Sequence, residues 1–438
     1  MNPVLELLLD EQRSAPLPPL TRRDVRMPEL PGMATALVGM RRVGKSYVLF
    51  QEMQRLVASG TPRSSILALN LEDDRLGPPN LTILSDALEY LFRTGPVRHD
   101  QPGYLFLDEI QAVRGWEQFV LRVLNTENVR VYVTGSSAKL LSTEIATGLR
   151  GRSTAIEMLP FSFREYLRHH GLEDLSRAPV GAAARSELES AFDVYLRTGG
   201  FPGVQSMEPV DRRRTLQDYV GLVTFRDVVD RWDAANLVAL KWLVAQLLSS
   251  FSREFSINKL HNDLRSQGIP AGKDTLHTYL EHLIDARLVH TVSIRRASYR
   301  ARQVNPRKAY AVDPGLAAAV AHPSADDTGH LLENAVYMEL RRRYSRLHDD
   351  AISYFAEKAG SADFVVDTGS EAPRILQVCT TLSESGTRQR ELRGAEAAMA
   401  QLGVTESTLV TLYEHDRIST LAGTINVVPA WRWSLETS

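Results

Sequence analysis

Short runs of mostly apolar residues, separated by longer amphipathic segments, mark the first third of the chain. Four such runs lie at residues 33–40, 64–72, 103–110 and 129–137. Runs of this length are typical of strands that are buried on both faces of a parallel sheet. The segment 45–60, between the first two runs, has helical periodicity and ends at a glycine, as helices often do. This alternation predicts a doubly wound α/β domain.

The remaining two thirds of the chain become mostly helical and then mixed. Residues 161–232 carry several helical patterns in succession. Residues 236–320 follow the order helix, turn, helix and β-ribbon, which is the order of a winged helix-turn-helix. From about residue 330 the order becomes helix, two or three strands, helix and two further strands. Because 438 residues exceed what one hydrophobic core usually holds, we expect several domains.

A glycine-rich loop joins the first predicted strand to the first predicted helix. Residues 39–46 read GMRRVGKS and fit the phosphate-loop pattern G-x-x-x-x-G-K-[ST]. In that pattern, backbone N–H groups and the N-terminus of the helix face the phosphates of a nucleotide. We expect Lys45 to neutralise the β- and γ-phosphates of ATP and Ser46 to coordinate Mg²⁺. The residues expected to contact the nucleotide are Gly39, Met40, Arg41, Arg42, Val43, Gly44, Lys45, Ser46 and Tyr47.

Polar residues end the other strands of the same predicted sheet. The third apolar run ends in Asp108 and Glu109. We expect Asp108 to hold Mg²⁺ through a water molecule and Glu109 to orient and deprotonate the attacking water. The next run ends in Thr134, Ser136 and Ser137. A polar residue there either senses the γ-phosphate or positions this water, or the three residues simply begin a loop. Asn70 ends another run and is a candidate restraint on Glu109.

Two arginines precede the next strand-like run. Arg150 and Arg152 belong to the segment TGLRGRSTAIE, residues 147–157. An arginine supplied to the nucleotide of a neighbouring subunit would stabilise the charge that develops during phosphoryl transfer. We expect one of the two to act as such a finger. The alternative for either residue is a solvated basic turn.

Several of these motifs together resemble those of a known family. They are similar to segments of bacterial and archaeal AAA+ ATPases that carry a winged helix and a C-terminal domain with a restriction-endonuclease-like fold. The resemblance covers nearly the whole chain. It rests on GMRRVGKS, LFLDEIQ, TGSSAKLL, GRSTAIEMLPFSFREY and YLRTGGFPGV, which begin at residues 39, 105, 134, 151 and 195.

The resemblance implies a multidomain α/β architecture. AAA+ proteins commonly work as rings, so we expect a homo-oligomer, with a hexamer as one form. Such a ring would give a use to arginines that act on a neighbour's nucleotide. The expected parts are a P-loop AAA+ core with a parallel sheet (1–165), a helical lid (166–235), a winged helix-turn-helix (236–325) and a restriction-endonuclease-like α/β domain (326–438).

The predicted β-ribbon carries many basic residues. Residues 293–310, SIRRASYRARQVNPRKAY, contain no acid. Such a hairpin beside a helix-turn-helix could clamp the phosphates of duplex DNA, and the expected contacts are Arg295, Arg296, Arg300 and Arg302. The preceding predicted helix carries Glu281 and Asp285, which would repel phosphates in the groove. Winged helices also bind proteins, so both kinds of partner remain open.

The last domain raises the question of a nuclease site. Restriction-endonuclease-like sites bind Mg²⁺ with a helix Glu, a strand Asp and an E-x-K motif on the next strand. Glu333 and Asp363 match the first two positions. In the third element, Gln377 replaces the acid and Cys379 replaces the lysine. We therefore expect a retained fold with a degenerate site that does not cut.

Composition limits the cellular setting. The formal net charge of −2 gives no global attraction to nucleic acid. A single cysteine excludes an internal disulfide framework and fits a reducing cytoplasm. No apolar run approaches the roughly 18 residues that a bilayer crossing needs, and the N-terminus is a poor signal peptide. We expect a cytoplasmic protein without a membrane segment.

Three functions follow from these observations. The first is an ATPase that drives or switches an assembly acting on DNA, with a nuclease-like domain used only for binding. The second is a signalling or scaffolding ATPase whose two C-terminal modules bind protein. The third and weaker hypothesis is a metal-dependent nuclease that ATP gates.

Overall fold

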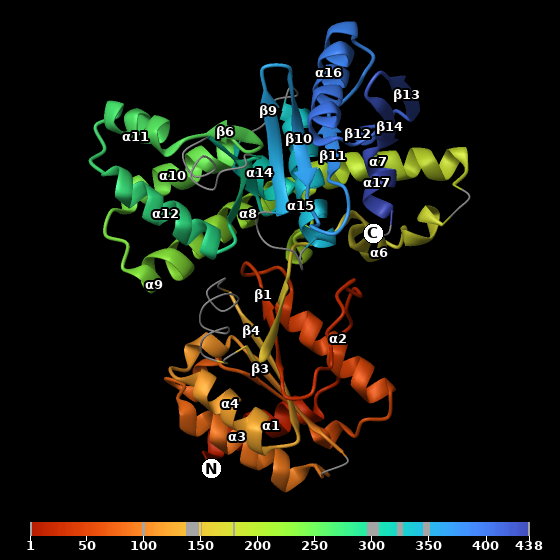
Figure 1. Ribbon diagram of the computed structural model, residues 1–438. Helices are drawn as coiled ribbons and strands as arrows, with labels where there is room; N and C mark the ends of the chain where they lie inside the picture. The colour runs from red at the N-terminus through yellow and green to blue at the C-terminus, as the bar shows by residue number, and fades with distance from the viewer. Residues whose placement is uncertain are drawn as a thin grey trace. The chain divides into compact units, whose positions relative to one another are not determined.

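The computed structural model describes residues 2–98, 101–136, 149, 151–177, 180–295, 306–321, 327–344 and 351–436. The chain divides into two compact units, Met1–Leu159 and Pro160–Ser438 (Figure 1). Among the described residues, no helix combines the length and the apolar character that a bilayer crossing requires.

The first unit contains a five-stranded parallel sheet in the order β2-β3-β4-β1-β5. Every neighbouring pair of strands is parallel, so their carboxyl ends lie along one edge. The predicted α/β class with a parallel sheet is confirmed for this unit. The strands are β1 (Ala34–Val38), β2 (Ile66–Asn70), β3 (Gly103–Asp108), β4 (Val129–Gly135) and β5 (Ser153–Glu157).

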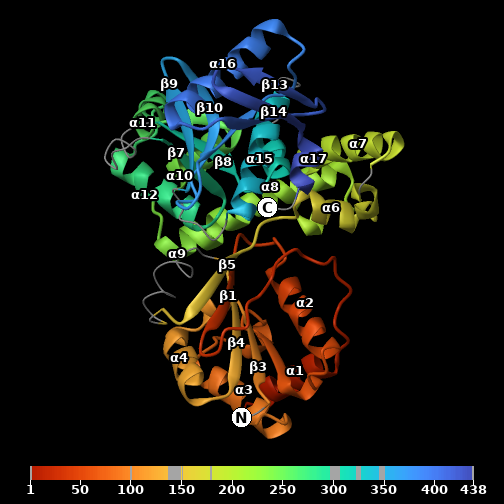
Figure 2. The ribbon, with the colours of Figure 1, turned by 45° about the vertical axis from the view of Figure 1, so that its right-hand side comes forward.

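Helices cover both faces of this sheet. Helix α2 lies on the opposite side of the sheet from α4 in both ribbon views (Figures 1 and 2). The helices of the unit are α1 (Pro3–Ser14), α2 (Lys45–Ala58), α3 (Leu81–Thr94) and α4 (Trp116–Thr126), with short 3₁₀ turns at Arg63–Ser65, Asp74–Leu76 and Ile110–Ala112.

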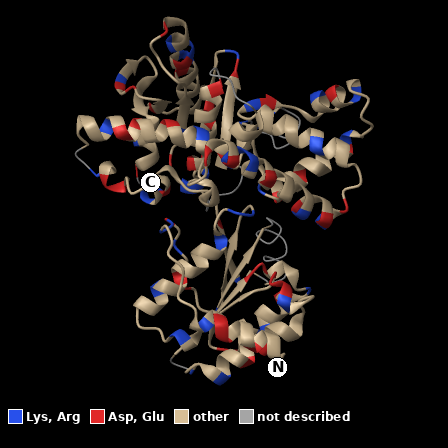
Figure 3. Cartoon of the chain, turned by 180° about the vertical axis from the view of Figure 1, so that it is seen from behind, with Lys and Arg blue, Asp and Glu red and all other residues tan. Residues whose placement is uncertain are grey.

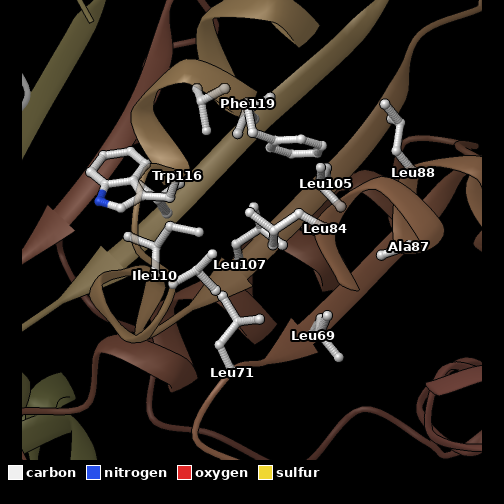
Figure 4. Close-up of a cluster of buried hydrophobic side chains, with 14 of the residues drawn as sticks. Leu69, Leu71, Leu84, Ala87, Leu88, Leu105, Leu107, Ile110, Trp116 and Phe119 are labelled. Carbon is white, nitrogen blue, oxygen red and sulfur yellow. The ribbon is translucent and has the colours of Figure 1, made fainter. Parts of the chain in front are cut away.

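A hydrophobic core of the first unit lies between the sheet and helices α1, α3 and α4, and part of it is drawn in Figure 4. Leu105 and Leu107 on β3 face Leu84 of α3 and Phe119 of α4, and all four are at most 4% exposed. Two-residue alternation along β3 places Phe106 on the other face, where it stacks on Tyr132 with ring centroids 4.5 Å apart. Each such buried side chain stabilises the fold by about 1.5–3 kcal/mol.

The second unit begins with a helical region. Two segments quoted above as family motifs meet there, because the N–H of Phe161 donates to the carbonyl of Gly200 over 2.7 Å. A Cβ atom on Gly200 would lie 2.2 Å from the carbonyl oxygen of Phe161, so the approach requires glycine. The helices are α6 (Phe163–His169), α7 (Ala182–Thr198), α8 (Pro209–Val223) and α9 (Asp230–Trp232), with 3₁₀ turns at Glu173–Ser176 and Pro202–Val204 and a π-helical turn at Thr224–Val229.

The helix, turn, helix and β-ribbon predicted after residue 236 are all present. Helix α12 begins after Gly272, and its buried positions Leu276, Leu280 and Leu283 repeat at helical spacing. The elements are α10 (Leu237–Ser249), β6 (Arg253–Phe255), α11 (Ile257–Ser266), α12 (Lys273–Asp285), β7 (Val289–Ile294), β8 (Arg307–Ala311) and α14 (Pro314–Ala321).

The ribbon belongs to the same sheet as the C-terminal strands. The order is β13-β14-β12-β11-β10-β9-β7-β8-β6, and β7 pairs in parallel with β9. A single sheet therefore crosses the boundary predicted at residue 325. The C-terminal elements are α15 (Thr328–Arg343), β9 (Ile352–Glu357), β10 (Gly360–Val366), β11 (Arg374–Val378), α16 (Ser385–Leu402), β12 (Glu406–Thr411), β13 (Asp416–Thr420), β14 (Gly423–Pro429) and α17 (Ala430–Leu435).

Candidate functional site

The phosphate loop lies at the carboxyl edge of the parallel sheet, between β1 and α2. Gly39 follows β1 directly, and a Cβ atom there would lie 2.2 Å from the carbonyl oxygen of Met158. Gly44 precedes α2 with φ 96°, a left-handed conformation that favours glycine. Gly44, at the N-cap, has no side chain that could cap the first turn of α2, so this residue leaves the backbone N–H groups of that turn to an anion.

The side chains in and just after the loop differ in their exposure and in their partners. Met40 and Val43 are fully buried, so they can meet a nucleotide only through their backbone. Tyr47, in the first turn of α2, is 52% exposed and is free to meet a base or a sugar. Arg41 forms a two-bond ion pair with Glu72, with N–O distances of 3.1 and 3.2 Å.

The two predicted magnesium ligands lie together. The hydroxyl of Ser46 donates to Oδ2 of Asp108 over 2.6 Å. The hydroxyl of Thr134, on β4, donates to Oδ1 of the same carboxylate and accepts from the N–H of Glu109 over 3.0 Å. Thr134 therefore fixes the end of β3, and the carboxylate and hydroxyl oxygens form the type of ligand set that Mg²⁺ prefers.

Glu109, the residue predicted to activate the attacking water, lies beside Lys45 of the phosphate loop. Nζ of Lys45 lies 3.5 Å from Oε1 of Glu109 and donates to the carbonyl of Gly39 over 3.1 Å. The amide of Gln111 donates to Oε2 of Glu109 over 2.5 Å. Glu109 itself has φ 54°, an uncommon conformation for a residue with a side chain and one often found at functional sites.

Asn70 has a different partner from the one predicted. Its side-chain oxygen accepts from the N–H of Glu72 over 3.0 Å. Gln111, which our sequence interpretation did not single out, holds Glu109 instead. The sequence did contain a signal, because Gln111 follows the acidic pair of a quoted motif. Its Oε1 atom is buried and accepts no hydrogen bond from the described residues, so a water beside Glu109 could donate to it.

The two acids differ in their protonation behaviour. Burial raises the pKa of Asp108, against the effect of hydrogen bonds from Ser46 and Thr134. Burial alone would also raise the pKa of Glu109, but the Lys45 ammonium and the Gln111 amide hold that pKa below its usual value. Glu109 is therefore ionised near neutral pH, as a general base must be.

A buried arginine braces the loop from outside the motif. Arg23 is 6% exposed, and its guanidinium donates to the carbonyl of Val43 over 2.8 Å and to that of Leu159 over 2.6 Å. Its N–H donates to Oε1 of Gln51 on α2 over 2.7 Å. Arg23 thus ties the loop to the end of the unit. It lies well before the motif, and sequence reasoning did not find it.

The remaining predicted catalytic residues are Ser136, Arg150 and Arg152. Ser136, just after β4, is 1% exposed. Arg152 precedes β5 and donates to the side-chain oxygen of Asn125. Because phosphate-loop residues follow the carboxyl end of β1, Arg152 lies at the opposite edge of the sheet. Arg150 lies outside the described residues.

The described cations of the ribbon are paired with acids. Arg295 lies 2.9 Å from Asp367. Arg307 lies 3.9 Å from Glu281. The other predicted DNA contacts, Arg296, Arg300 and Arg302, lie outside the described residues. Basic and acidic residues are interspersed along the backbone of the second unit in Figure 3.

The nuclease-like positions contain a positive charge that the sequence interpretation considered absent. Lys308, from β8, places Nζ 2.9 Å from Glu333 and 2.8 Å from Asp363. Cys379, at the position of the expected lysine, is 8% exposed and belongs to the core beneath α16. An ammonium therefore lies beside Glu333 and Asp363, although it comes from a strand that the predicted motif does not include.

Comparisons with known proteins agree with the geometry of the first unit. Residues 32–167 match the AAA domain family, and residues 189–327 match a domain family of unknown function. An uncharacterized protein of Methanocaldococcus jannaschii is 30% identical over 98% of this chain and 94% of its own length. An uncharacterized protein of Haemophilus influenzae is 28% identical over 75% of this chain and 80% of its own length.

A solved structure is also similar. The Walker-type ATPase of Pyrococcus abyssi matches with a TM-score of 0.40 and 17% identity, over 66% of this chain and 90% of that one.

Proposed function

Because the chain belongs to the family of the uncharacterized Methanocaldococcus jannaschii protein and carries an AAA domain, we propose that it binds and hydrolyses ATP at the phosphate loop. The observation that carries the proposal is the 2.6 Å contact between Ser46 and Asp108. This contact joins the first turn of α2 to the end of β3. A phosphate-binding loop and an acidic strand end therefore meet at one point.

Each group at this point has a distinct role. The N–H groups of the first turn of α2 bind phosphate oxygens, and Lys45 neutralises their charge. Ser46 and Asp108 would hold Mg²⁺, which supplies further positive charge to the phosphates. Glu109 orients the attacking water and accepts its proton. Bound phosphate competes with Glu109 for Lys45, and this competition frees the carboxylate to act as a base.

ATP turnover by three variants tests the proposal. Lys45→Ala removes the phosphate-neutralising charge and is expected to lower turnover by about 100-fold or more. Glu109→Gln is expected to keep ATP binding but to lower turnover by about 100-fold or more. Glu89→Gln changes an exposed acid of α3 and should leave turnover unchanged. Turnover that survives Lys45→Ala would rule out this site.

The assembly is proposed to be a homo-oligomeric ring, with a hexamer as one form. Arg152 lies at the edge of the sheet away from the phosphate loop, so it would serve a neighbouring subunit rather than its own. Arg150 is the second candidate for this role. The test mixes two variants, one with Lys45→Ala and one with both arginines replaced by Ala. We expect the mixture to regain part of the ATP turnover that each variant alone has lost. The lack of any recovery would argue against a finger that acts between subunits.

Duplex DNA is the partner that we propose for the second unit. The support is the helix-turn-helix beside a ribbon of basic residues. A protein partner is the alternative, and one observation favours it: Arg295 and Arg307 each lie beside an acid. Binding to a labelled duplex over a range of salt concentrations, with and without ATP, distinguishes the two. Duplex binding that weakens steeply as salt is added supports DNA as the partner. If the protein does not bind the duplex even at low salt, the result supports a protein partner.

A further inference from the structure

A cluster of buried charges joins the ribbon to the C-terminal part of the sheet. Lys308 on β8 places its ammonium between Glu333 of α15 and Asp363 of β10, at 2.9 and 2.8 Å. The side chains of the three residues are only 11–15% exposed. One ammonium therefore neutralises charge on two carboxylates that come from separate elements.

The protein itself satisfies most of the carboxylate oxygens in this cluster. The hydroxyl of Tyr310 donates to Oε1 of Glu333 over 2.7 Å. The N–H of Val378 donates to Oδ2 of Asp363 over 3.0 Å. Three carboxylate oxygens thus receive donors from the chain. The carboxylates therefore have little remaining hydrogen-bonding or metal-binding capacity for an added ligand.

The neighbouring motif positions are also occupied. Gln377 accepts from the N–H of Asp363 over 3.2 Å and donates its amide to Glu391. Both the oxygen and the nitrogen of its side-chain amide therefore already have a hydrogen-bond partner. No group of three or more metal-ligating His, Cys, Asp or Glu side chains is found among the described residues. These residues do not fit the divalent cation that the nuclease-like fold implies.

Strand β8 is held in place independently of the charges. Asn334, next to Glu333 on α15, accepts from the N–H of Ala311 over 2.8 Å and donates to its carbonyl over 3.0 Å. This pair of hydrogen bonds fixes the end of β8 against α15. Lys308, three residues earlier on the same strand, is thereby aimed at the carboxylates.

We propose that the Lys308 ammonium is a built-in cation, which occupies the place between Glu333 and Asp363 that a divalent metal ion would otherwise take. When both carboxylates are ionised, the lysine neutralises one of their two negative charges. Burial and the nearby Asp363 carboxylate raise the pKa of Glu333 to about 7, so this state is fully reached only above neutral pH. With Lys308 in place, the cluster holds the ribbon against α15 and β10. Without Lys308, the same carboxylates would form an open site for Mn²⁺ or Mg²⁺. The proposal does not depend on ATP hydrolysis.

Binding of Mn²⁺ to the nucleotide-free protein, followed by the paramagnetic resonance signal of the free ion, tests the proposal. Lys308→Met removes the charge but keeps an unbranched chain. It is expected to bind one more equivalent of Mn²⁺ than the unchanged protein. The extra equivalent should be lost in Lys308→Met combined with Asp363→Asn. Lys358→Met, at an exposed lysine in the turn between β9 and β10, is the matched control and should gain no site.

Two results of the Mn²⁺ titrations would overturn the proposal. One is a folded Lys308→Met variant that gains no Mn²⁺. The other is an unchanged protein that binds Mn²⁺ and loses it on Asp363→Asn, because the lysine would then leave the metal site open.

A triple variant covers the case in which Lys308→Met does not fold. Lys308→Met combined with Glu333→Gln and Asp363→Asn leaves no unpaired charge in the cluster. This triple variant should regain cooperative thermal unfolding. A triple variant as unfolded as Lys308→Met alone would mean that Lys308 is not needed as a countercharge, which also overturns the proposal.

Discussion

The side-chain amide of Gln111, which comes two residues after Glu109, donates a hydrogen bond to the carboxylate of Glu109 over 2.5 Å. Glu109 is also within 3.5 Å of the Lys45 ammonium. The carboxylate is therefore held from two sides before any nucleotide arrives. In the proposed mechanism Gln111 is a positioning residue, because it contacts the proposed base, Glu109, rather than the phosphates.

Replacing Gln111 with Ala should slow ATP turnover and change its pH dependence. We expect a loss of about tenfold, a fraction of the 10²–10⁴-fold contribution typical of a general base. The hydrogen bond from Gln111 lowers the pKa of Glu109, so its removal raises that pKa. The acidic limb of the turnover profile should therefore move to higher pH. The measurement is turnover at saturating ATP from pH 5 to 9.

The matched control is Gln118→Ala, which changes an exposed glutamine of α4. Its profile should coincide with that of the unchanged protein. A Gln111→Ala variant that loses activity equally at every pH would show a general structural effect and not a role in positioning Glu109.

Replacing Arg23 with Met should weaken both the fold and ATP binding. The change leaves the carbonyls of Val43 and Leu159 without their buried donor, which costs about 1–3 kcal/mol of unfolding free energy. Because Val43 belongs to the phosphate loop, the dissociation constant for ATP should rise as well. Denaturant titration and ATP titration are the two measurements. Arg22→Met, at an exposed neighbour, is the control.

The two readouts separate two roles for Arg23. A loss of stability with unchanged ATP affinity would show that Arg23 supports the fold of the first unit without shaping the loop.

Local patterns made the first unit predictable. The phosphate loop, the apolar runs and the acids at the end of β3 are each contained within a few residues. In a parallel sheet, the carboxyl ends of all strands meet at one edge, so the pattern alone could place Lys45 near Glu109. Arg23 escaped detection because its contacts are to backbone carbonyls, which leave no pattern in the sequence.

Long-range pairing made the second unit harder to predict. Lys308 appeared as one of six basic residues in a ribbon, and the sequence offers no sign that it meets Glu333 and Asp363, which lie 25 and 55 residues further on. The pairing of β7 with β9 likewise joins strands on both sides of a predicted domain boundary. Strand pairing of this kind depends on three-dimensional context rather than on local propensity.

The arginines of the ribbon should differ in their contribution to DNA binding. Neutralising Arg296, Arg300 or Arg302 should each reduce the slope of log affinity against log salt by about 1, if each meets one phosphate. Arg295→Ala should change the slope less, because its guanidinium lies 2.9 Å from Asp367. The measurement is duplex binding at several salt concentrations. Equal effects of all four substitutions would mean that the contact with Asp367 does not withhold Arg295 from DNA.

The thiol of Cys379 should be nearly inert in the folded protein. Burial, together with the nearby carboxylates of Glu391, Glu414 and Asp363, raises the pKa of this thiol to about 12. At pH 8 only about 1 in 10⁴ thiols would then be the reactive thiolate. Alkylation by iodoacetamide should be at least about 100-fold slower in the native protein than in the unfolded protein.

The chain offers a direct internal comparison for this reaction, because Cys379 is its only cysteine. Ser383→Cys adds a second thiol at an exposed position four residues later. In that variant one thiol per chain should react quickly and the other only after denaturation. Native labelling of Cys379 at the rate of the added thiol would contradict its assignment as a buried core residue. It would also reopen the question of whether this strand carries chemistry.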